Sequence, residues 1–560
     1  MMIKKKWVSD NSKIDLINFL KKETGLDESV IRILVNRNID TKEEVYNFLN
    51  PSLSNLFDPF LLNDMDKAVE RIKDAIKNKE KIFIYGDYDA DGVTASSLLY
   101  LSVKKVYGDV SIYIPEREKE GYGLNSYAID KIKAMGGSLI ITVDCGITSV
   151  DEAEYARNIG IDMIITDHHT CPDSLPSCVA VINPKRKDST YPFKELCGAG
   201  VSLKLSTALG IFDERLLAIC AIGTIADIVP LVSENRIIAY YGIESLKKGI
   251  LPNINVLMEV SELSYKDINA RTIGFLIAPK INAAGRMENA GYAVEFFTTS
   301  DNLRMKELAL YLDNLNKTRQ ECEKEILISA KEKIEKDDEL KEDILILSGE
   351  GWHEGVIGIV ASRITEEYHK PCILLSVNDG IAKGSSRSIK GFNIYEALKA
   401  VSENLEKFGG HELAAGLTVK EEKISVFKEE IQKYAKEIFK NGRIYPEIMI
   451  DCELKESNIN IDFAEFLLKL EPYGMGNSEP VFLIKDSKVI NSYPFSNDKH
   501  MRLIVKKGDK ELETVGFGLG LRANSLKRGD NIYIALTFGI NEFRGNKKVQ
   551  GIVKDIKLEK

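Results

Sequence analysis

The sequence predicts an α/β protein of several domains that ends in an all-β barrel. Apolar runs alternate with helix-like stretches from Lys81 to about residue 167, which is the pattern of a mostly parallel sheet. A second alternation of the same kind begins near residue 344. From about residue 480 the chain shows short strands separated by Gly, Asn and Asp turns and no strong helix, which indicates a small barrel.

Length and composition limit the class of protein further. At 560 residues the chain is too long for one hydrophobic core. No stretch approaches the roughly 18 apolar residues of a membrane helix, and the N-terminus lacks the apolar core of a signal peptide, so we expect a cytoplasmic protein. The eight cysteines are scattered without a C-x-x-C pair, which argues against a zinc ribbon and gives no sign of a disulfide framework.

The elements follow one another in an order that suggests five parts. Short amphipathic helices broken by Pro51 and Pro59 predict an N-terminal wrapping segment. A charged stretch at residues 302–338, mostly free of Pro and Gly, predicts a long helix between two α/β domains. In the second domain, GIAKGSSRS and KFGGHELAAG are interpreted as glycine-rich turns. The expected parts are the wrapping segment at 1–75, a catalytic domain at 76–300, the bridging helix at 301–340, a substrate-binding domain at 341–450 and the barrel at 451–560.

Charge is distributed unevenly along the chain. The formal net charge is −9. Residues 481–560 hold 16 Lys and Arg against 9 Asp and Glu, a net +7, which leaves −16 for the remainder. A basic module on an acidic body suits a part that follows a polyanion, although a solvated Lys-rich surface is an equally simple explanation.

Three carboxylates, those of Asp87, Asp89 and Asp91, lie on one tight turn directly after an apolar run. Like charges at this spacing repel unless a cation or well-placed donors offset them, and hard cations prefer oxygen ligands. The string also matches the first half of an EF-hand calcium loop. That interpretation fails because the twelfth position is Leu98 instead of a bidentate Glu, and because the preceding residues predict a strand. The turn therefore predicts a metal site at the edge of an α/β sheet.

Further acidic and imidazole residues occur where later apolar runs end. Asp144 follows LIITV, Asp167, His168 and His169 follow DMIIT, and Asp227 lies in GTIADIVPL. Ligands of open α/β sheets bind outside the carboxyl ends of the strands, so we expect these side chains to converge. Any one of them alone is more often a cap or turn residue. Carboxylate and imidazole ligands without thiolates indicate Mn²⁺ or Mg²⁺, and several carboxylates could bridge two ions.

Several strings resemble a known enzyme family. DYDADG, VDCG and TDHH are similar to the motifs of the DHH phosphoesterase superfamily. Their order, together with GTIADIVPL, PKINAAGR, KGSSRS and GGH, resembles the RecJ-type exonucleases within that superfamily, and the resemblance covers roughly residues 50–560. It implies a DHH phosphoesterase domain with a parallel sheet, a DHH-associated domain and an oligonucleotide-binding barrel.

The resemblance also implies an activity and its residues. The activity is metal-dependent 5′ to 3′ degradation of single-stranded DNA to 5′ mononucleotides by two-ion hydrolysis, in DNA repair and recombination. The implied ligands of two Mn²⁺ or Mg²⁺ ions are Asp87, Asp89, Asp91, Asp144, His168 and Asp227. The implied catalytic residues are Asp144, His168 and His169, the last either behind the ligands or at the scissile phosphate. The implied substrate-binding residues are Arg117, Arg286, Ser385, Ser386, Arg387 and His411.

Partners and the barrel complete the expectations. Single-stranded DNA, a single-strand-binding protein and a helicase are the expected partners of a monomer without membrane association. In the barrel the candidate DNA contacts are Lys499, His500, Arg502, Phe517, Phe543 and Arg544, although aromatics in a small barrel are more often core. One departure from the family string is Lys280 in place of Arg, which keeps the charge but loses the bidentate fork, so we do not expect a direct phosphate role there.

Two other functions remain open at this stage. A DHH-family hydrolase of short oligonucleotides, cyclic dinucleotides or pyrophosphate would share the site, but the resemblance implies that such relatives lack the C-terminal barrel and the N-terminal segment. A non-catalytic scaffold at a replication fork would have lost metal ligands, whereas every acidic and imidazole position named above is present.

Overall fold

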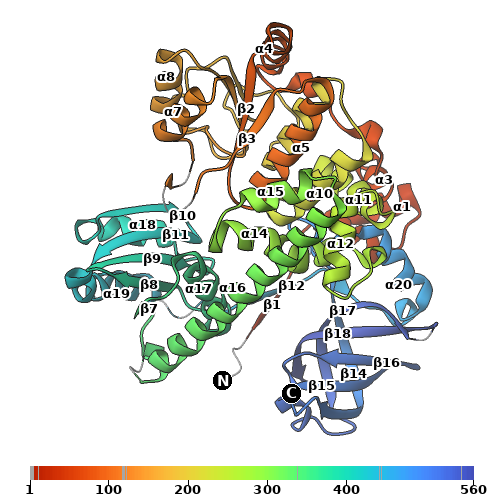
Figure 1. The fold of residues 1–560 in the computed structure, drawn as a ribbon. Helices are drawn as coiled ribbons and strands as arrows, with labels where there is room; N and C mark the ends of the chain where they lie inside the picture. Colours follow the sequence, from red (N-terminus) through yellow and green to blue (C-terminus); the bar gives the residue numbers. More distant parts are fainter. Residues whose placement is uncertain are drawn as a thin grey trace. The chain divides into compact units, whose positions relative to one another are not determined.

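The chain divides into two compact units, drawn together in Figure 1. The computed structural model describes residues 5–10, 12–116, 120–121, 123–336, 339–440, 442, 444–543 and 545–559. The larger unit comprises Trp7–Asp313 and Ile448–Lys560, and the smaller unit comprises Asn314–Glu447 with the residues before Trp7. No helix within the described ranges is long and apolar enough to cross a membrane.

A five-stranded sheet in the order β3-β2-β4-β5-β6 lies in the larger unit, and all of its neighbouring strands are parallel. The strands are β2 (Lys81–Gly86), β3 (Val110–Tyr113), β4 (Gly137–Val143), β5 (Asp162–Thr166) and β6 (Ala180–Ile182). One face packs against α7 (Ser126–Ala134) and α8 (Val150–Asn158), and Phe83 and Tyr85 lie in that core. Figure 1 shows α5 (Ala90–Val106) on the opposite side of the strands. The predicted alternation and parallel sheet are confirmed.

A group of helices follows this sheet in the chain. Its members are α9 (Gly198–Ala208), α10 (Glu214–Ala226), α11 (Ser233–Lys247), α12 (Pro252–Val260), α13 (Ala270–Thr272), a π-helical turn (Ile273–Ile277), α14 (Ala278–Met287) and α15 (Gly291–Thr298). Helices α9 and α10 both pack on α5, so that α5 is buried along most of its length. The group therefore closes the second face of the sheet.

The C-terminal residues of the larger unit form a closed barrel. Its strands run in the order β13-β14-β15-β16-β18-β17, and β17 pairs back with β14. The strands are β13 (Cys452–Glu453), β14 (Val481–Phe495), β15 (His500–Lys507), β16 (Lys510–Gly516), β17 (Asn531–Phe543) and β18 (Asn546–Leu558), with the short helices α20 (Ile461–Leu467) and α21 (Gly520–Ala523). The predicted all-β barrel is confirmed.

The N-terminal helices belong to the core of this barrel. They are α1 (Ile14–Thr24), α2 (Glu28–Val35) and α3 (Lys42–Leu49), whereas α4 (Met65–Asn78) contacts β6 of the parallel sheet. Ile31 and Leu34 of α2 are fully buried in one apolar cluster with Phe482 and Ile534 of the barrel. Two short strands, β1 (Lys6–Ser9) and β12 (Glu447–Ile450), pair with each other.

The smaller unit is a second α/β fold. Its sheet has the order β10-β11-β9-β8-β7, in which only β7 and β8 are parallel. The strands are β7 (Leu345–Glu350), β8 (Cys372–Asn378), β9 (Ile381–Arg387), β10 (Lys407–His411) and β11 (Ala414–Lys420), and the helices are α17 (Glu354–Tyr368), α18 (Ile394–Ala400) and α19 (Ile424–Phe439). The predicted long helix is α16 (Asn302–Lys336), and the division between the units falls within it, after Asp313.

One local prediction in this unit is wrong. The two glycine-rich strings interpreted as turns are strands β9, β10 and β11. Gly384 lies in β9 between β8 and β11, where a Cβ would come within 2.6 Å of both Leu375 and Leu417. The glycine is therefore required by the close approach of side chains from two neighbouring strands.

Candidate metal centre

The turn after β2 holds three carboxylates, two of which accept hydrogen bonds from the backbone of different helices. Asp89 is the N-cap of α5, and its Oδ1 accepts hydrogen bonds from the backbone N–H groups of Asp91 and Gly92 at 2.9 and 3.0 Å. Asp91 is buried, and its carboxylate accepts from the N–H groups of Gly198 and Ala199 at the start of α9, at 2.6 and 2.9 Å. The turn is thus fixed by backbone donors from two helices, which keeps its carboxylates in place.

The ends of β4 and β5 bring an aspartate and a histidine to this turn. Asp144 follows β4 with a φ of 60°, a left-handed conformation that is uncommon for a residue other than glycine. Its Oδ1 lies 3.1 Å from His168 Nε2, which in turn lies 3.6 Å from Asp227 Oδ2 and 3.9 Å from Asp91 Oδ2. Asp227 is the C-cap of α10 and directly follows the last residue of that helix, Ala226. The structure therefore brings together the residues that the strand ends predicted.

Ligand atoms of these residues form three groups in which all atoms lie within 4.8 Å of one another. The groups are Asp87, Asp89 and Asp144; Asp91, His168 and Asp227; and Asp144, His168 and His169. Asp144 Oδ1 and both ring nitrogens of His168 are buried and find no hydrogen-bond partner among the described residues. Buried polar atoms without a partner are costly, and a bound cation would satisfy them. The donors are carboxylates and imidazoles without thiolate, which fits Mn²⁺ or Mg²⁺.

Electrostatics of the cluster also favour a cation. Burial, followed by repulsion from Asp89, raises the pKa of Asp91 to about 6. Burial, followed by repulsion from Asp91, raises the pKa of Asp227 to about 8 and that of Asp144 well above its usual range. Burial lowers the pKa of His168 to about 3, which leaves the imidazole neutral as a metal ligand must be. Several carboxylates therefore resist ionisation here until positive charge is supplied.

Asp167 positions His169, a role that the sequence did not reveal. Its carboxylate accepts hydrogen bonds from the backbone N–H groups of Ile147 and His168 and approaches His169 Nδ1 at 2.8 Å. Burial opposes protonation of His169, but this contact outweighs it and raises the pKa of His169 to about 9. Asn183 then donates to the carbonyl oxygen of His169 at 2.9 Å. Asp167 thus holds the ring of His169 and Asn183 its backbone, and neither partner could be identified without the fold.

Helix α14 supports the carboxylate turn from behind. Asn282 accepts a hydrogen bond from the N–H of Ala90 at 2.8 Å, and Gly285 packs directly on the backbone of Tyr88. Lys280 is buried and forms an ion pair with Asp313, so its ammonium is engaged inside the protein, as the loss of the arginine fork suggested. Arg286, one of the predicted substrate contacts, is half-buried at the end of this helix.

The substitution Gly285→Ala tests this support. A Cβ at this position would lie 2.3 Å from the carbonyl oxygen of Tyr88, so the turn must move. We expect a loss of about 1–3 kcal/mol in the free energy of unfolding and weakened Mn²⁺ binding, measured by thermal unfolding and calorimetric titration. Gly274→Ala is the matched control, because its Cβ would meet nothing closer than 3.9 Å, and it should leave both quantities nearly unchanged. Equal behaviour of the two variants would contradict the packing argument.

Three predicted substrate contacts lie close together in the smaller unit. The Arg387 guanidinium donates to Ser385 Oγ at 3.2 Å, and both side chains pack on Gly358 of α17. Ser386 is fully buried and donates to the carbonyl oxygen of Ala415 at 2.8 Å, so its hydroxyl faces the sheet interior. His411 is exposed at the end of β10. Arg117, like Arg544 of the barrel, lies outside the described residues.

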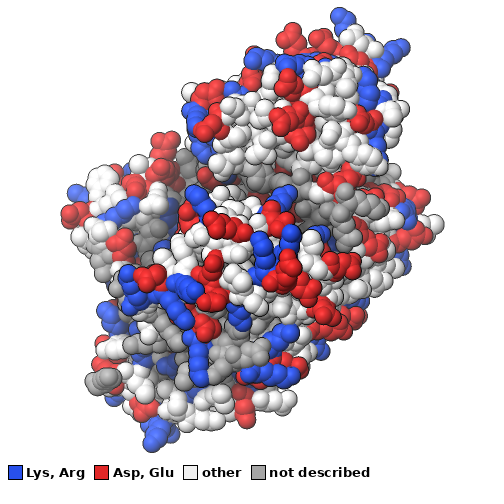
Figure 2. Space-filling model, turned by 90° about the vertical axis from the view of Figure 1, so that its left-hand side faces the viewer, with Lys and Arg blue, Asp and Glu red and all other residues white. Residues whose placement is uncertain are grey.

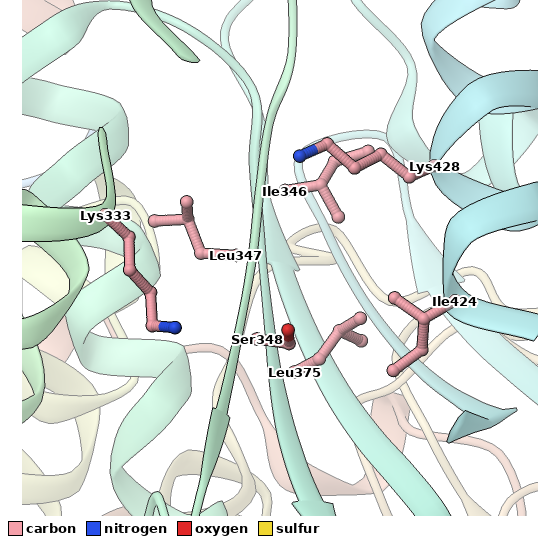
Figure 3. A pocket seen from close by; sticks show the side chains of 7 residues that line it. All are labelled: Lys333, Ile346, Leu347, Ser348, Leu375, Ile424 and Lys428. Carbon is pink, nitrogen blue, oxygen red and sulfur yellow. The ribbon is translucent and has the colours of Figure 1, made fainter. Parts of the chain in front are cut away.

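A pocket elsewhere in the smaller unit contains none of the predicted site residues. Figure 3 shows Ile346 and Leu347 pointing to opposite sides of β7, with Lys333 on one side and Lys428 on the other. The remaining lining residues are Ser348, Leu375 and Ile424. Its ionisable groups are two lysines, which cannot ligate a divalent cation, so this pocket is not the metal centre.

Surface charge does not mark a binding site on the face that Figure 2 draws. Figure 2 shows basic and acidic side chains interspersed over the face that it draws, without a large field of one sign among its described residues. Attraction of a polyanion to this face must therefore depend on particular cations.

Comparisons with known proteins identify the class to which this site belongs. The DHH family N-terminal domain matches residues 81–224, which contain the carboxylate turn, Asp144 and both histidines. The DHHA1 domain matches residues 341–437 and the RecJ OB domain matches residues 450–555. A parallel sheet whose strand ends hold these motifs thus defines a DHH phosphoesterase.

The full chain narrows this class. It is 38% identical over 556 residues to the single-stranded-DNA-specific exonuclease RecJ of Bacillus subtilis strain 168. The matched region comprises 99% of this chain and 71% of that protein. The crystal structure of RecJ in complex with Mn²⁺ from Thermus thermophilus superimposes with a TM-score of 0.83 at 26% identity, covering 99% of this chain and 80% of that one. The corresponding Mg²⁺ complex gives a TM-score of 0.77 at 25% identity, with coverages of 99% and 79%. The chain belongs to the RecJ family of single-stranded-DNA-specific exonucleases.

Proposed function

We propose that this protein degrades single-stranded DNA from the 5′ end to 5′ mononucleotides, using two divalent cations. The observation that carries the proposal is the group of carboxylate and imidazole ligand atoms at the carboxyl ends of β2, β4 and β5, in which Asp144 Oδ1 and both ring nitrogens of His168 are buried without a hydrogen-bond partner among the described residues. Family membership supports single-stranded DNA as the substrate. We place the reaction in the cytoplasm, in DNA repair and recombination, and expect a monomer that works with a single-strand-binding protein and a helicase.

Two ligand groups support two ion positions, one of Asp87, Asp89 and Asp144 and one of Asp91, His168 and Asp227. We propose these six residues as the ligands, and Mn²⁺ or Mg²⁺ as the ions. Asp144 lies 3.1 Å from His168 of the other group, so its carboxylate would be available to both positions. When bound, such ions supply a hydroxide nucleophile near neutral pH and neutralise the charge that develops on the phosphate oxygens.

The protein's own side chains would orient the substrate. The contact between His169 Nδ1 and Asp167 fixes the ring of His169, whose side chain is 43% exposed, so we propose that it reaches the scissile phosphate. A guanidinium and a hydroxyl are suited to a terminal phosphate, which assigns Arg387 and Ser385 to the 5′ end. Arg117, Arg286 and His411 are proposed as further contacts. Ser386 would act through the backbone of β9, because its hydroxyl is bound to Ala415.

The barrel is proposed to hold the strand behind the cleavage point. His500 lies 5.3 Å from the ring of Phe517, which is 60% exposed, and 5.4 Å from the ring of Phe495. Exposed rings of this kind stack on bases, and nearby cations follow the backbone. Lys499, Arg502, Phe543 and Arg544 complete the proposed contacts.

Digestion of single-stranded DNA labelled at either end tests the direction. With Mn²⁺ or Mg²⁺, a 5′ label should be released first as a mononucleotide, and chelator should stop the reaction. Release from the 3′ end, or activity in chelator, would overturn the proposal. Faster hydrolysis of dinucleotides or cyclic dinucleotides than of long strands would favour the alternative of a DHH-family phosphodiesterase of small substrates.

Arg387→Ala tests the assignment of the 5′ phosphate. Loss of a charge-assisted contact of about 1.5–3 kcal/mol should lower kcat/KM about 10- to 100-fold on 5′-phosphorylated strands. Strands with a 5′ hydroxyl should be affected far less. Lys383→Ala is the control, because Lys383 is exposed on the same strand and pairs with Glu354. An equal loss on both substrates would contradict the assignment.

A further inference from the structure

Lys185 lies at the edge of the metal centre but belongs to none of the motifs discussed so far. It follows β6, whose carboxyl end adjoins that of β5 in the sheet. Between them the fully buried Asn183 donates to the carbonyl oxygen of His169 at 2.9 Å and accepts from the backbone N–H of Lys185 at 2.8 Å. One buried amide thus ties the backbone of Lys185 to that of His169.

The ammonium group of Lys185 is covered but weakly engaged. Its side chain is only 29% exposed, and the ion pair that it makes, with Glu195, spans 3.8 Å. It forms no hydrogen bond with any residue in the described ranges. Asn183 holds the backbone of Lys185 beside that of His169 at the rim of the metal centre, and an ammonium there cannot be a metal ligand.

Charge balance indicates what such a cation would bind. Five carboxylates surround the proposed ion positions, so two divalent ions leave the centre with a net negative charge. A DNA phosphate entering the centre adds another negative charge, and a lysine is a point charge suited to phosphate oxygens. Glu195, which is 46% exposed, would hold the ammonium near the centre until the phosphate takes its place.

We propose that Lys185 binds a backbone phosphate of single-stranded DNA at the metal centre, as a positioning residue outside the family's metal-binding strings. The proposal rests on the proposed function. It predicts a contact close to the cleaved bond. Substitution of Lys185 should therefore lower kcat/KM on a 5′-phosphorylated trinucleotide as much as on a long strand.

Lys185→Met tests the proposal, with Lys187→Met as the matched control. Lys187 lies two residues away, is 76% exposed and pairs with Asp173 at 2.8 Å. Binding of a fluorescent single strand is measured at several salt concentrations in the otherwise unsubstituted protein with Ca²⁺ in place of Mn²⁺, after a control shows that the strand is not cleaved under these conditions. We expect Lys185→Met to weaken binding about tenfold and to reduce the log–log salt slope by about 0.7, the contribution of one phosphate. Lys185→Arg should restore most of both, and Lys187→Met should change neither.

Three results would overturn the assignment, and a fourth concerns the function itself. An unchanged salt slope in Lys185→Met, or a loss of Mn²⁺ affinity and melting temperature that matches the loss of binding, would show that Lys185 does not contact phosphate. A loss of kcat/KM on the long strand with none on the trinucleotide would place the contact away from the cleaved bond. If the unsubstituted enzyme degrades no single-stranded DNA, the proposed function fails. If the unsubstituted enzyme degrades single-stranded DNA and Lys185→Met binds and cleaves it equally well, only the inference about Lys185 fails.

Discussion

Asp144→Asn is expected to abolish nuclease activity while making the metal-free protein more stable. The carboxylate is 2% exposed, and its Oδ1 has no hydrogen-bond partner among the described residues. Burial and the neighbouring carboxylates raise the pKa of Asp144 well above its usual range, so without a cation the native state is destabilised by this group. Asparagine has the same shape and no charge. In chelator this buried group either carries an unpaired charge or has to take up a proton, so its removal should raise the free energy of unfolding by about 1–4 kcal/mol.

With metal the order of stability should reverse. Ions bound only by the folded protein stabilise it by about 2.7 kcal/mol at a hundredfold excess over Kd, and Asp144→Asn should lose most of that gain. Loss of a ligand that belongs to two of the three ligand groups should lower kcat about 10³-fold or more. Thermal unfolding in chelator and in Mn²⁺, with kcat on single-stranded DNA, provides the measurements.

Asp173→Asn is the control for this prediction, because Asp173 is 98% exposed and pairs with Lys187. It should behave as the unsubstituted protein with and without metal. If Asp144→Asn kept full activity in Mn²⁺, the catalytic assignment would be wrong. If it melted below the unsubstituted protein in chelator, the argument from buried charge would fail even with the activity lost.

The convergence of the site was predictable because strand ends in a parallel sheet meet at one edge. Asp87, Asp144 and His168 each follow a short apolar run, and the sheet order β2-β4-β5 makes those runs neighbours. Asp227 is different, because it ends helix α10 and no strand precedes it. The sequence grouped Asp227 with the strand ends, and that placement is wrong: the residue reaches the sheet edge from a helix end, which periodicity alone gives no reason to expect.

Other parts of the fold could not be predicted from local sequence. Helix α10 is buried on nearly every side from Leu216 to Thr224, so its sequence has no polar face and carries little periodic signal. Gly384 was misinterpreted as a turn residue because the two leucines that require it lie in strands β8 and β11. Burial of the N-terminal helices in the barrel core joins residues more than 400 positions apart, such as Leu34 and Leu454. Each of these depends on partners that are distant in the chain.

Arg236→Met is expected to cause the largest loss of stability in the larger unit. Arg236 lies on α11 and is 2% exposed, yet its guanidinium meets backbone carbonyls instead of a carboxylate. It donates to the carbonyl oxygens of Phe48 at 3.0 Å and of Leu470 and Lys469 at 2.9 Å, and it lies 3.8 Å from the centre of the Phe48 ring. One side chain thus joins α3, α11 and the segment that leads into the barrel.

The cost follows from what the substitution leaves behind. Methionine fills a similar volume but donates nothing, so the carbonyls of Phe48 and Lys469 lose a partner that water cannot easily replace, at about 1–3 kcal/mol for each group, whereas the carbonyl of Leu470 still accepts from Asn477 at 2.8 Å. We expect the free energy of unfolding to fall by about 4 kcal/mol or more, measured by urea denaturation with the change in midpoint as the readout. The substitution Arg236→Lys should restore little of the loss, because an ammonium reaches fewer of these carbonyls than the guanidinium fork does.

Arg304→Met is the matched control, since Arg304 is 38% exposed in a surface ion pair with Glu295 and such pairs contribute about 0–1 kcal/mol. The metal ligands do not contact Arg236, so the folded fraction of Arg236→Met should cleave single-stranded DNA with a kcat within about twofold of the unsubstituted protein, a difference below about 0.5 kcal/mol in the barrier. A midpoint shift no larger than that of Arg304→Met would show that the three carbonyls find other partners. A full loss of kcat in protein that remains folded would instead mean that the barrel and the N-terminal helices, which Arg236 holds to α11, are needed for the chemistry at the sheet edge.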